Sequence, residues 1–329
     1  MTAYRLFGAE TSPYSLKVRF FLRYKGVDFD WVLRSSVTEE EFKKHASLPT
    51  VPLLIRPDGK TSQDSTNMLA TLEKEHTAPS ANPDDPACQA LALMLEDYAD
   101  EWLNKAMFHF RWNQSPDKEA AAIRVLEQIF AGRAPARKRD AQASVVSRMS
   151  ERLPLVGATP ENVPVITASF QRFASLLNTH LEQTLFLFGG RPSSADFAIA
   201  GQIQQMLLDP TMNTWLNENA PFIVAWCEFM ESPTPGAPFV ALSELQDTLL
   251  PLFRDEISVT YLPWAAANSA AITKRKKAVT VDLADGPYEQ ATQRYAAKSF
   301  RTVKKAVGKL AKSDGLSAFL DASGIKGFL

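Results

Sequence analysis

Ser12 stands where an expected strand passes into an expected helix. The short apolar run Tyr4–Gly8 precedes it, and Pro13 and the apolar-periodic run Leu16–Tyr24 follow. A serine followed by a proline is a typical helix N-cap. The free N–H groups of a helix N-terminus stabilise an anion, and the serine hydroxyl can donate a hydrogen bond to a bound thiolate. Such contacts lower a thiol pKa and make the thiolate available as a nucleophile. Ser12 is therefore a candidate catalytic residue; an N-cap without a chemical role is the alternative.

A second group of residues suits the α-amino acid end of a ligand. Pro52 opens an expected strand, so the Val51–Pro52 bond is a candidate for the cis form, which exposes the backbone of Val51 to a ligand. Ser65 is expected to cap the next helix, where its N–H and hydroxyl can hold a carboxylate. Asp64 can bind the ammonium group of the same ligand. The alternative is a proline turn followed by an ordinary capping residue.

A third segment, Gly189–Ala198, carries a structural motif. Ser193 is followed three residues later by Asp196, which is a capping box with a carboxylate in place of the usual Glu or Gln. We interpret Asp196 as structural and not as catalytic.

The histidines do not indicate a metal site. His45, His76, His109 and His180 lack the spacing of metal ligands, so no metal is expected. His109 lies on an aromatic segment and is expected to be a hydrogen-bonded structural residue.

The composition excludes several classes of protein. Among 329 residues, 36 basic and 37 acidic side chains give a formal net charge of −1, so the molecule as a whole is not built to bind a polyanion. Hydrophobic residues make up 45%, enough for a sizeable core. Cys88 and Cys227 cannot form a disulfide framework, no apolar run approaches the ~18 residues of a membrane span, and no signal peptide is recognised. A soluble protein of the cytoplasm is expected.

The elements that position these residues change character along the chain. Residues 1–80 show the order β-α-β-α-β-β-α, which predicts a thioredoxin-like α/β domain with helices on both faces of its sheet. After the linker His76–Pro86, residues 86–232 predict an all-α helical domain. Pro-rich Ser232–Pro238 marks a second boundary, and residues 238–329 form an extension of unknown role. Helices are expected over Asp117–Ala131, Asp140–Arg152, Val165–Phe186, Ser194–Leu208 and Ala220–Glu231.

One long helix is expected over Ala87–Trp112. Its apolar stripe consists of Leu91, Leu95, Tyr98 and Trp102, and its opposite, polar face consists of Asp97, Asp100, Glu101 and Asn104. A pocket for a flat apolar molecule is expected between Tyr14 and this helix, with Phe108 and Trp112 in its wall. Packing of these aromatic residues in the core or at a dimer contact is the alternative.

The extension carries a basic stripe. A strand is expected over Ala278–Leu283 and a basic helix over Tyr288–Lys312, preceded by the basic run Lys274–Lys277. The basic positions on the helix are spaced three and four apart: Arg294, Lys298, Arg301, Lys305, Lys309 and Lys312. An acidic partner, a nucleic acid or an anionic membrane would suit such a stripe. We favour a solvated helix face, whose other side packs on the body through Tyr295, Phe300, Val303 and Val307. No nucleic acid or membrane partner is therefore expected.

Taken together and in this order, the three segments resemble the glutathione transferase superfamily. S-P-Y-S-L-K-V-R is similar to the serine-type active-site segment of that family, S-P-[FY]-x-x-[KR]-V-R. V-P-L-L, then D-G, then D-S-T resemble its cis-proline and γ-glutamyl site, and S-S-A-D-F-A resembles its helical capping box. The resemblance covers Tyr4 to Glu231.

The resemblance implies a site for glutathione as co-substrate. Ser12 would activate the glutathione sulfur, the backbone of Val51 beside cis-Pro52 would pair with the cysteinyl unit, and Asp64 and Ser65 would hold the γ-glutamyl amine and carboxylate. Lys43, Lys44 and His45 are candidates for the partner of the glycyl carboxylate.

The activity implied is attack of the glutathione thiolate on an apolar electrophile, a detoxification reaction, by a homodimer. A non-catalytic ligand-binding or interaction protein of the same fold is one alternative, and glutathione-dependent isomerisation or ether cleavage is another. Asp64 stands where many members have glutamate, and no cysteine occupies the position of Ser12, which argues against glutathionyl-disulfide exchange. The extension after Pro238 has no counterpart in the family plan and is a candidate cover for the second-substrate pocket.

Overall fold

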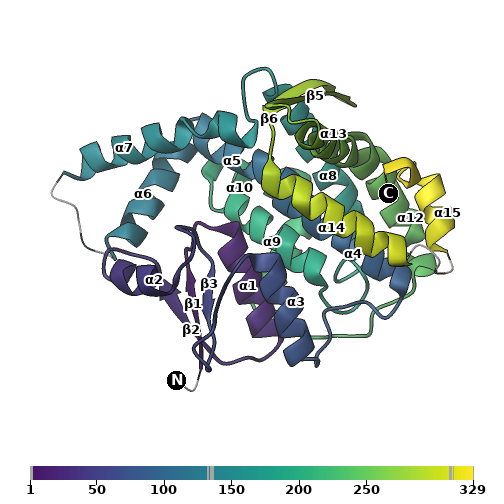
Figure 1. The fold of residues 1–329 in the computed structure, drawn as a ribbon, viewed down its shortest axis with the longest axis horizontal. Coiled ribbons are helices and arrows are strands. Elements are labelled where there is room, and N and C mark those ends of the chain that lie inside the picture. Colours follow the sequence, from purple (N-terminus) through teal and green to yellow (C-terminus); the bar gives the residue numbers. More distant parts are fainter. Residues whose placement is uncertain (1–2, 132, 134–136, 311–312, 314, 329) are drawn as a thin grey trace.

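The N-terminal part of the chain folds around a four-stranded sheet in the order β2-β1-β3-β4 (Figure 1). The computed structural model describes residues 3–131, 133, 137–310, 313 and 315–328. β1 pairs parallel with β2 and antiparallel with β3, and β4 pairs antiparallel with β3. The elements are β1 (Tyr4–Gly8), α1 (Pro13–Tyr24), β2 (Phe29–Leu33), α2 (Glu39–His45), β3 (Leu53–Ile55), β4 (Thr61–Gln63) and α3 (Ser65–Glu75).

Alternation along the strands explains why helices cover both faces of this sheet. Leu6 of β1 lies opposite Leu54 of β3, and both belong to the large core that includes α1 and α3. Their neighbours Phe7 and Leu53 point the other way, into a separate cluster with Phe42 of α2. Successive strand residues face opposite sides, so each strand serves both layers. The predicted thioredoxin-like α/β domain is confirmed.

The elements between Pro86 and Met230 are helices, as predicted for residues 86–232. They are α4 (Pro86–Tyr98), α5 (Asn104–Asn113), α6 (Asp117–Ile129), α7 (Lys138–Ser150), α8 (Val163–Leu181), α9 (Ser194–Leu207), α10 (Pro210–Asn219) and α11 (Pro221–Met230). α4 and α5 form the long helix expected from the sequence, joined by a π-helical turn at Ala99–Leu103. α10 was not predicted.

The capping box at the start of α9 has the structural role predicted for it. Asp196 is fully buried, and its Oδ2 accepts a hydrogen bond from the backbone N–H of Ser193 at 2.8 Å. Its Oδ1 accepts one from the N–H of Leu187 at 2.9 Å. The carboxylate thus satisfies donors at the helix start and in the preceding turn.

Gly201 lets α9 approach the N-terminus of α1. A Cβ atom at position 201 would lie 2.5 Å from the carbonyl oxygen of Pro13, well inside van der Waals contact. The close approach fixes the first turn of α1 against the helical domain. The segment that begins at Ser12 is therefore held from both sides, by the sheet and by α9.

The extension is part of the core and not an appendage. It contains α12 (Leu242–Leu252), a π-helical segment (Phe253–Tyr261), α13 (Leu262–Thr273), β5 (Ala278–Leu283), β6 (Gly286–Ala291), α14 (Arg294–Leu310) and α15 (Leu316–Ala322). One hydrophobic cluster runs from Leu6 in the sheet to Ile325 near the end of the chain.

An ion-pair cluster ties the extension to α8. Arg172 Nε donates to Glu256 Oε2 at 2.9 Å, and its Nη2 donates to Asp285 Oδ2 at 2.9 Å. Glu256 is fully buried and also accepts from the hydroxyl of Ser169 at 2.5 Å. Burial outweighs these contacts and raises the pKa of Glu256 to about 7. A buried carboxylate with several partners is costly to separate from them.

The predicted strand Ala278–Leu283 is confirmed as β5, whereas the basic helix begins later than predicted. Tyr288 lies in β6, paired with Val281, because Gly286 at φ 130° turns the chain into a hairpin. The helix α14 starts at Arg294.

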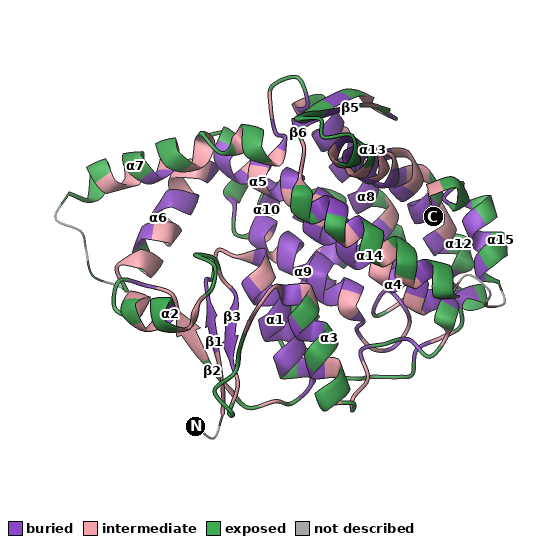
Figure 2. Ribbon diagram, viewed as in Figure 1, coloured by how far each residue is buried: buried purple, intermediate pink, exposed green. Residues whose placement is uncertain are grey.

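α14 carries the predicted division into a basic and an apolar face. The basic side chains Arg294, Lys298, Arg301, Lys305 and Lys309 are exposed (Figure 2). Phe300 and Val307 are buried against the body, but Tyr295 is 51% exposed and does not belong to the packed face. Lys312 lies outside the described residues. Among the described residues, no helix has the length and apolar character needed to span a bilayer.

Candidate active site

A cavity of about 380 Å³ opens where the sheet domain meets the α4–α5 junction. Its lining comes from five separate segments of the chain. The lining residues are Tyr14, Leu48, Thr50, Val51, Pro52, Asp64, Ser65, Asp100, Glu101 and Tyr295.

The residues expected to bind an α-amino acid end meet in this cavity. The Val51–Pro52 peptide bond is cis, as anticipated. Ser65 is buried at the first turn of α3, but the N-cap of that helix is Asp64, not Ser65. The Oδ1 atom of Asp64 accepts a hydrogen bond from the N–H of Asn67 at 3.3 Å. Asp64 has φ 90°, a conformation that costs a non-glycine residue about 1–3 kcal/mol, and such strain is concentrated at binding sites.

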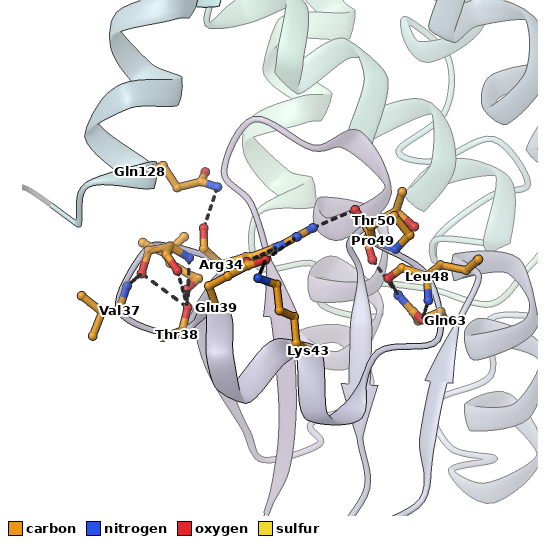
Figure 3. Close-up of polar contacts among 12 residues, drawn as sticks. Arg34, Val37, Thr38, Glu39, Lys43, Leu48, Pro49, Thr50, Gln63 and Gln128 are labelled. Carbon is orange, nitrogen blue, oxygen red and sulfur yellow. Dashed lines mark hydrogen bonds and ion pairs between the residues drawn. The ribbon is translucent and has the colours of Figure 1, made fainter. Parts of the chain in front are cut away.

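The loop that carries Leu48, Thr50 and Val51 is held by two side chains that sequence reasoning did not single out (Figure 3). The amide of Gln63 accepts from the N–H of Leu48 at 2.8 Å and donates to the carbonyl of Thr50 at 2.7 Å. Arg34 donates to the carbonyl of Pro49 at 2.8 Å and pairs with Glu39. Because the Gln63 amide both accepts from and donates to the loop backbone, it fixes the loop, and the cavity wall is preorganised. In the sequence, Gln63 is recognisable only as a polar residue at the end of β4.

Ser12 caps α1 but does not belong to the cavity lining. Its Oγ accepts a hydrogen bond from the N–H of Ser15 at 3.2 Å. Ser12 is half-buried and stands two residues before Tyr14, which lines the cavity. The hydroxyl proton of Ser12 is not needed for the cap, so it can be donated to another group.

Tyr14 is held against the helical domain. Its hydroxyl donates to the carbonyl oxygen of Asp100 at 2.9 Å and accepts from Asn104 Nδ2 at 2.9 Å. Burial raises the pKa of Tyr14 far above its ordinary value, so the phenol stays neutral. Tyr14 lines the cavity, and its assignment to the second-substrate side stays a prediction.

The polar face of the long helix supplies the acidic wall of the cavity. Asp97 and Asp100 are buried, and the π-helical turn carries Asp100 and Glu101 to the cavity. Burial, with the neighbouring Asp97 and Asp100 carboxylates, raises the pKa of Glu101 to about 8. π-helical turns occur frequently at functional sites. This face lies between the two domains and under α14, not in solvent.

Lys17 of α1 neutralises part of this wall. Its Nζ lies 2.6 Å from Glu96 Oε1 and 2.6 Å from Asp100 Oδ2, and the side chain is 1% exposed. Burial lowers the pKa of Lys17, but the two carboxylates outweigh it and raise the pKa above its ordinary value. The charged lysine therefore links the sheet domain to α4 directly behind the cavity.

Tyr295 of α14 brings the extension into the cavity. Its hydroxyl donates to Asp64 Oδ2 at 2.8 Å. Partial burial of the phenol and the neighbouring Asp64 raise the pKa of Tyr295, so the phenol stays protonated as a donor. The extension, which was expected to cover the second-substrate side, thus contacts Asp64, the candidate residue for binding the amine. Its spacing on the helix had suggested core packing instead.

Phe108 and Trp112 do not line the cavity. Trp112 is 3% exposed and packs with Ala121 and Leu126 of α6, and Phe108 packs on the same cluster. The expectation that they form the wall of a second-substrate pocket is therefore replaced by its alternative, packing in the core. They lie on the side of α5 that packs against α6 and α7. Because α5 is rich in aromatic residues, its periodicity does not show which of its sides faces a pocket. The Nδ1 atom of His109 on the same helix is buried without a hydrogen-bond partner among the described residues, which contradicts the expectation of a hydrogen-bonded histidine.

Among the residues that the structure describes, no basic side chain lines the cavity. Of the candidates for a glycyl carboxylate, Lys43 is 70% exposed and pairs with Glu39 at 3.6 Å; Lys44 and His45 belong to the same short helix α2. Within the described ranges, no group of His, Cys, Asp or Glu is arranged to hold a metal ion.

The comparisons with known proteins agree with this architecture. The glutathione S-transferase N-terminal domain model matches residues 11–75, and the C-terminal domain model matches residues 138–229. Glutathione S-transferase U16 of Arabidopsis thaliana is 30% identical over 129 residues, which are 38% of this chain and 55% of that protein. The chain thus spans about half the length of this curated relative.

Solved structures show a more distant likeness. A glutathione S-transferase from Methylobacterium radiotolerans, in complex with glutathione sulfonate, has 23% identity and a TM-score of 0.46 over 73% of this chain and 96% of that one. The beta-etherase LigF from Sphingobium has 17% identity and a TM-score of 0.47 over 70% and 96%.

A thioredoxin-like domain followed by a helical domain with its capping box defines a two-domain transferase fold. The chain belongs to the glutathione transferase superfamily.

Proposed function

We propose that the chain binds glutathione in the cavity of about 380 Å³ and transfers its thiolate to an apolar electrophile. One observation carries the proposal: Val51, Pro52, Asp64 and Ser65, chosen as an α-amino acid site from the sequence, line one cavity together. The γ-glutamyl ammonium would meet Asp64, the carboxylate would meet the N-terminus of α3 at Ser65, and the cysteinyl backbone would pair with Val51. The thiol would then point toward Ser12 at the start of α1.

Asp64 is the group of the cavity lining that favours a cationic group in the ligand. Asp100 is paired with Lys17, and Glu101, with a pKa of about 8, is mostly protonated at neutral pH. Among the described residues of the lining, none is basic. An ammonium group gains from such surroundings. The electrophile would occupy the side near Tyr14. A homodimer in the cytoplasm belongs to this proposal, as does a glycyl carboxylate held by Lys43, Lys44 or His45.

A non-catalytic glutathione-binding protein is the second candidate. The observation that favours it is the position of Ser12, which caps α1 without lining the cavity. Isomerisation and ether cleavage use the same glutathione site, so they differ from conjugation only in the second substrate.

Product analysis distinguishes these functions. The purified chain would be incubated with glutathione and, separately, with an aryl halide, an aryl ether and an unsaturated keto acid, and the products identified by mass spectrometry. We expect a glutathione adduct of the aryl halide. Ether cleavage or isomerisation without any adduct would replace conjugation by that reaction, and saturable binding without a product in any arm would favour the non-catalytic protein.

Tyr295→Phe is expected to tighten glutathione binding roughly two- to tenfold, because one hydrogen bond of about 0.5–1.5 kcal/mol need not be broken. Asp64 Oδ2 already accepts from Asn67 Nδ2 at 2.9 Å, so the carboxylate keeps its orientation without Tyr295. The tyrosine hydroxyl therefore competes with the ligand ammonium for this oxygen.

Calorimetric titration measures the change, with deamino-glutathione as the control ligand. Its affinity is expected to be the same for both proteins, because it has no ammonium group to compete with Tyr295. Weaker binding of glutathione to Tyr295→Phe would refute competition and make Tyr295 a ligand contact.

A further inference from the structure

Glu101 is the acidic residue of the candidate glutathione cavity that has no assigned role. It belongs to the π-helical turn Ala99–Leu103 and lines the cavity together with Tyr14 and Tyr295. Burial raises the pKa of Tyr14, and the neighbouring Glu101 raises it further. After burial and Asp64, Glu101 also contributes to the raised pKa of Tyr295. Glu101 therefore lies near both phenols, on the side of the cavity proposed for the electrophile.

The carboxyl group of Glu101 is open to the cavity. The residue is half-buried, and neither of its carboxyl oxygens is among the sealed polar atoms of the protein. Within the described part of the chain, no hydrogen bond or ion pair joins this carboxyl to another residue. A molecule in the cavity can therefore contact the Glu101 carboxyl directly.

The other acidic groups of the lining are engaged by donors. Lys17 Nζ lies 2.6 Å from Asp100 Oδ2, and the hydroxyl of Tyr295 donates to Asp64 Oδ2 at 2.8 Å. Contacts of this kind favour the ionised form of a carboxyl group. Glu101 has no such donor among the described residues, so it differs from both aspartates in being free to carry a proton.

The surroundings of Glu101 keep it protonated at neutral pH. Burial raises its pKa to about 8, and Asp97 and Asp100 add to the rise, whereas Lys105 and Lys17 oppose it without cancelling it. The titratable groups that lie around it are Tyr14 and Lys17 of α1, Asp64 before α3, Asp97, Asp100 and Lys105 of its own helix, and Tyr295 of α14. A pKa near the operating pH suits a group that gives up a proton during a reaction.

Both phenols beside Glu101 already donate their protons. The hydroxyl of Tyr14 donates to the carbonyl oxygen of Asp100 at 2.9 Å, and that of Tyr295 donates to Asp64. Neither phenol is therefore free to protonate a bound substrate, and the Glu101 carboxyl is the acid that can do so.

We propose that Glu101 is a catalytic proton donor to the second substrate, and that the substrate class it serves is the α,β-unsaturated ketones. This inference rests on the glutathione transfer proposed above. The glutathione sulfur bonds to the β carbon, the π electrons of the C=C bond move toward the carbonyl group, and the carbonyl oxygen takes the proton of Glu101. The enol that forms becomes the ketone. The Glu101 carboxylate regains a proton from water, which is balanced by the proton that the thiol released on ionisation.

The test compares the unmodified chain with Glu101→Gln on two electrophiles. The enone 4-phenyl-3-buten-2-one needs a proton at its oxygen, whereas 1-chloro-2,4-dinitrobenzene loses chloride and needs none. We expect the variant to lose at least about a hundredfold in kcat/KM for the enone, as for removal of a general acid, and to keep its rate with the aryl halide. Glutamine has the shape of protonated glutamic acid without a proton to transfer, so the fold and the affinity for glutathione are expected to stay the same. Glu218→Gln, at an exposed position of α10, is the matched control and is expected to change neither rate.

The pH profile separates proton donation from a structural role. At saturating glutathione, the enone rate of the unmodified chain is expected to fall as pH rises through about 8, because only the protonated carboxyl can donate, whereas the aryl-halide rate is not expected to fall. Equal losses with both electrophiles in Glu101→Gln, or weaker glutathione binding in that variant, would make Glu101 a structural or glutathione contact and overturn the proposal. An unchanged enone rate in a variant that still conjugates the aryl halide would overturn it and leave glutathione transfer standing. No adduct of either electrophile with the unmodified chain would remove glutathione transfer itself, and this inference with it.

Discussion

Ser12→Ala is expected to lower kcat/KM for conjugation by at least about tenfold, since removal of one donor to a developing anion commonly costs much more than that. The hydroxyl belongs to the N-cap residue of α1, where the helix dipole also favours a negative charge. Without it, less of the bound glutathione is ionised at neutral pH. The loss is expected to be smaller at pH 9, where the thiol ionises unaided.

Two variants of the same segment control for loss of folding. Ser15 is fully buried and its hydroxyl has no hydrogen-bond partner among the described residues, so Ser15→Ala is expected to keep the activity. Ser12→Thr retains both the cap and the hydroxyl and is expected to recover most of it. Steady-state kinetics over pH 6–9 measure all three. Full activity of Ser12→Ala at pH 6.5 would remove Ser12 from the mechanism.

Lys17→Met is expected to destabilise the fold by about 3–5 kcal/mol, the usual result of removing one partner from a buried ion pair. The substitution leaves Glu96 and Asp100 buried together without the ammonium that lies 2.6 Å from each. Lys17 lies in α1, whereas Glu96 lies in α4 and Asp100 in the π-helical turn after it. Loss of the lysine therefore weakens the contact between the two domains. Equilibrium denaturation in urea measures the change.

The cost of Lys17→Met depends on pH. Burial raises the pKa of Asp100 and Lys17 opposes that rise, so without the lysine the folded-state pKa of Asp100 lies further above its unfolded value and the folded protein binds more protons than the unfolded one. The free energy of unfolding then falls as pH rises, and the variant is expected to lose more stability at pH 8 than at pH 5. Lys60→Met is the control, because the side chain of Lys60 is 78% exposed and its pair with Asp58 contributes little. Equal stability losses at both pH values would contradict this account.

The sheet domain and half of the candidate site were predictable because their signals are local. The alternation of residues along a strand is visible within the strand itself. Pro52 stands next to β3, and the Asp64–Ser65 pair stands at the start of α3. They were sufficient to bring Val51, Asp64 and Ser65 to one cavity.

The contributions from distant segments were not predictable from local patterns. Tyr295 reaches Asp64 across 231 positions, and its place on α14 resembled a core position. Helix α5 is buried on more than one side, so its apolar periodicity could not distinguish the side of Trp112, which meets α6, from the side of His109, which meets a cavity. Asp97, Asp100 and Glu101 looked like a solvated face because nothing local indicated that α1 and α14 cover them.

The central claim, a glutathione site that ionises the thiol, is tested most directly by an ultraviolet difference titration of glutathione into the purified chain near neutral pH. We predict a saturable thiolate absorbance in the unmodified chain and its loss in Ser12→Ala. Saturable binding without thiolate absorbance would contradict thiol activation, and no binding at millimolar glutathione would contradict the site itself.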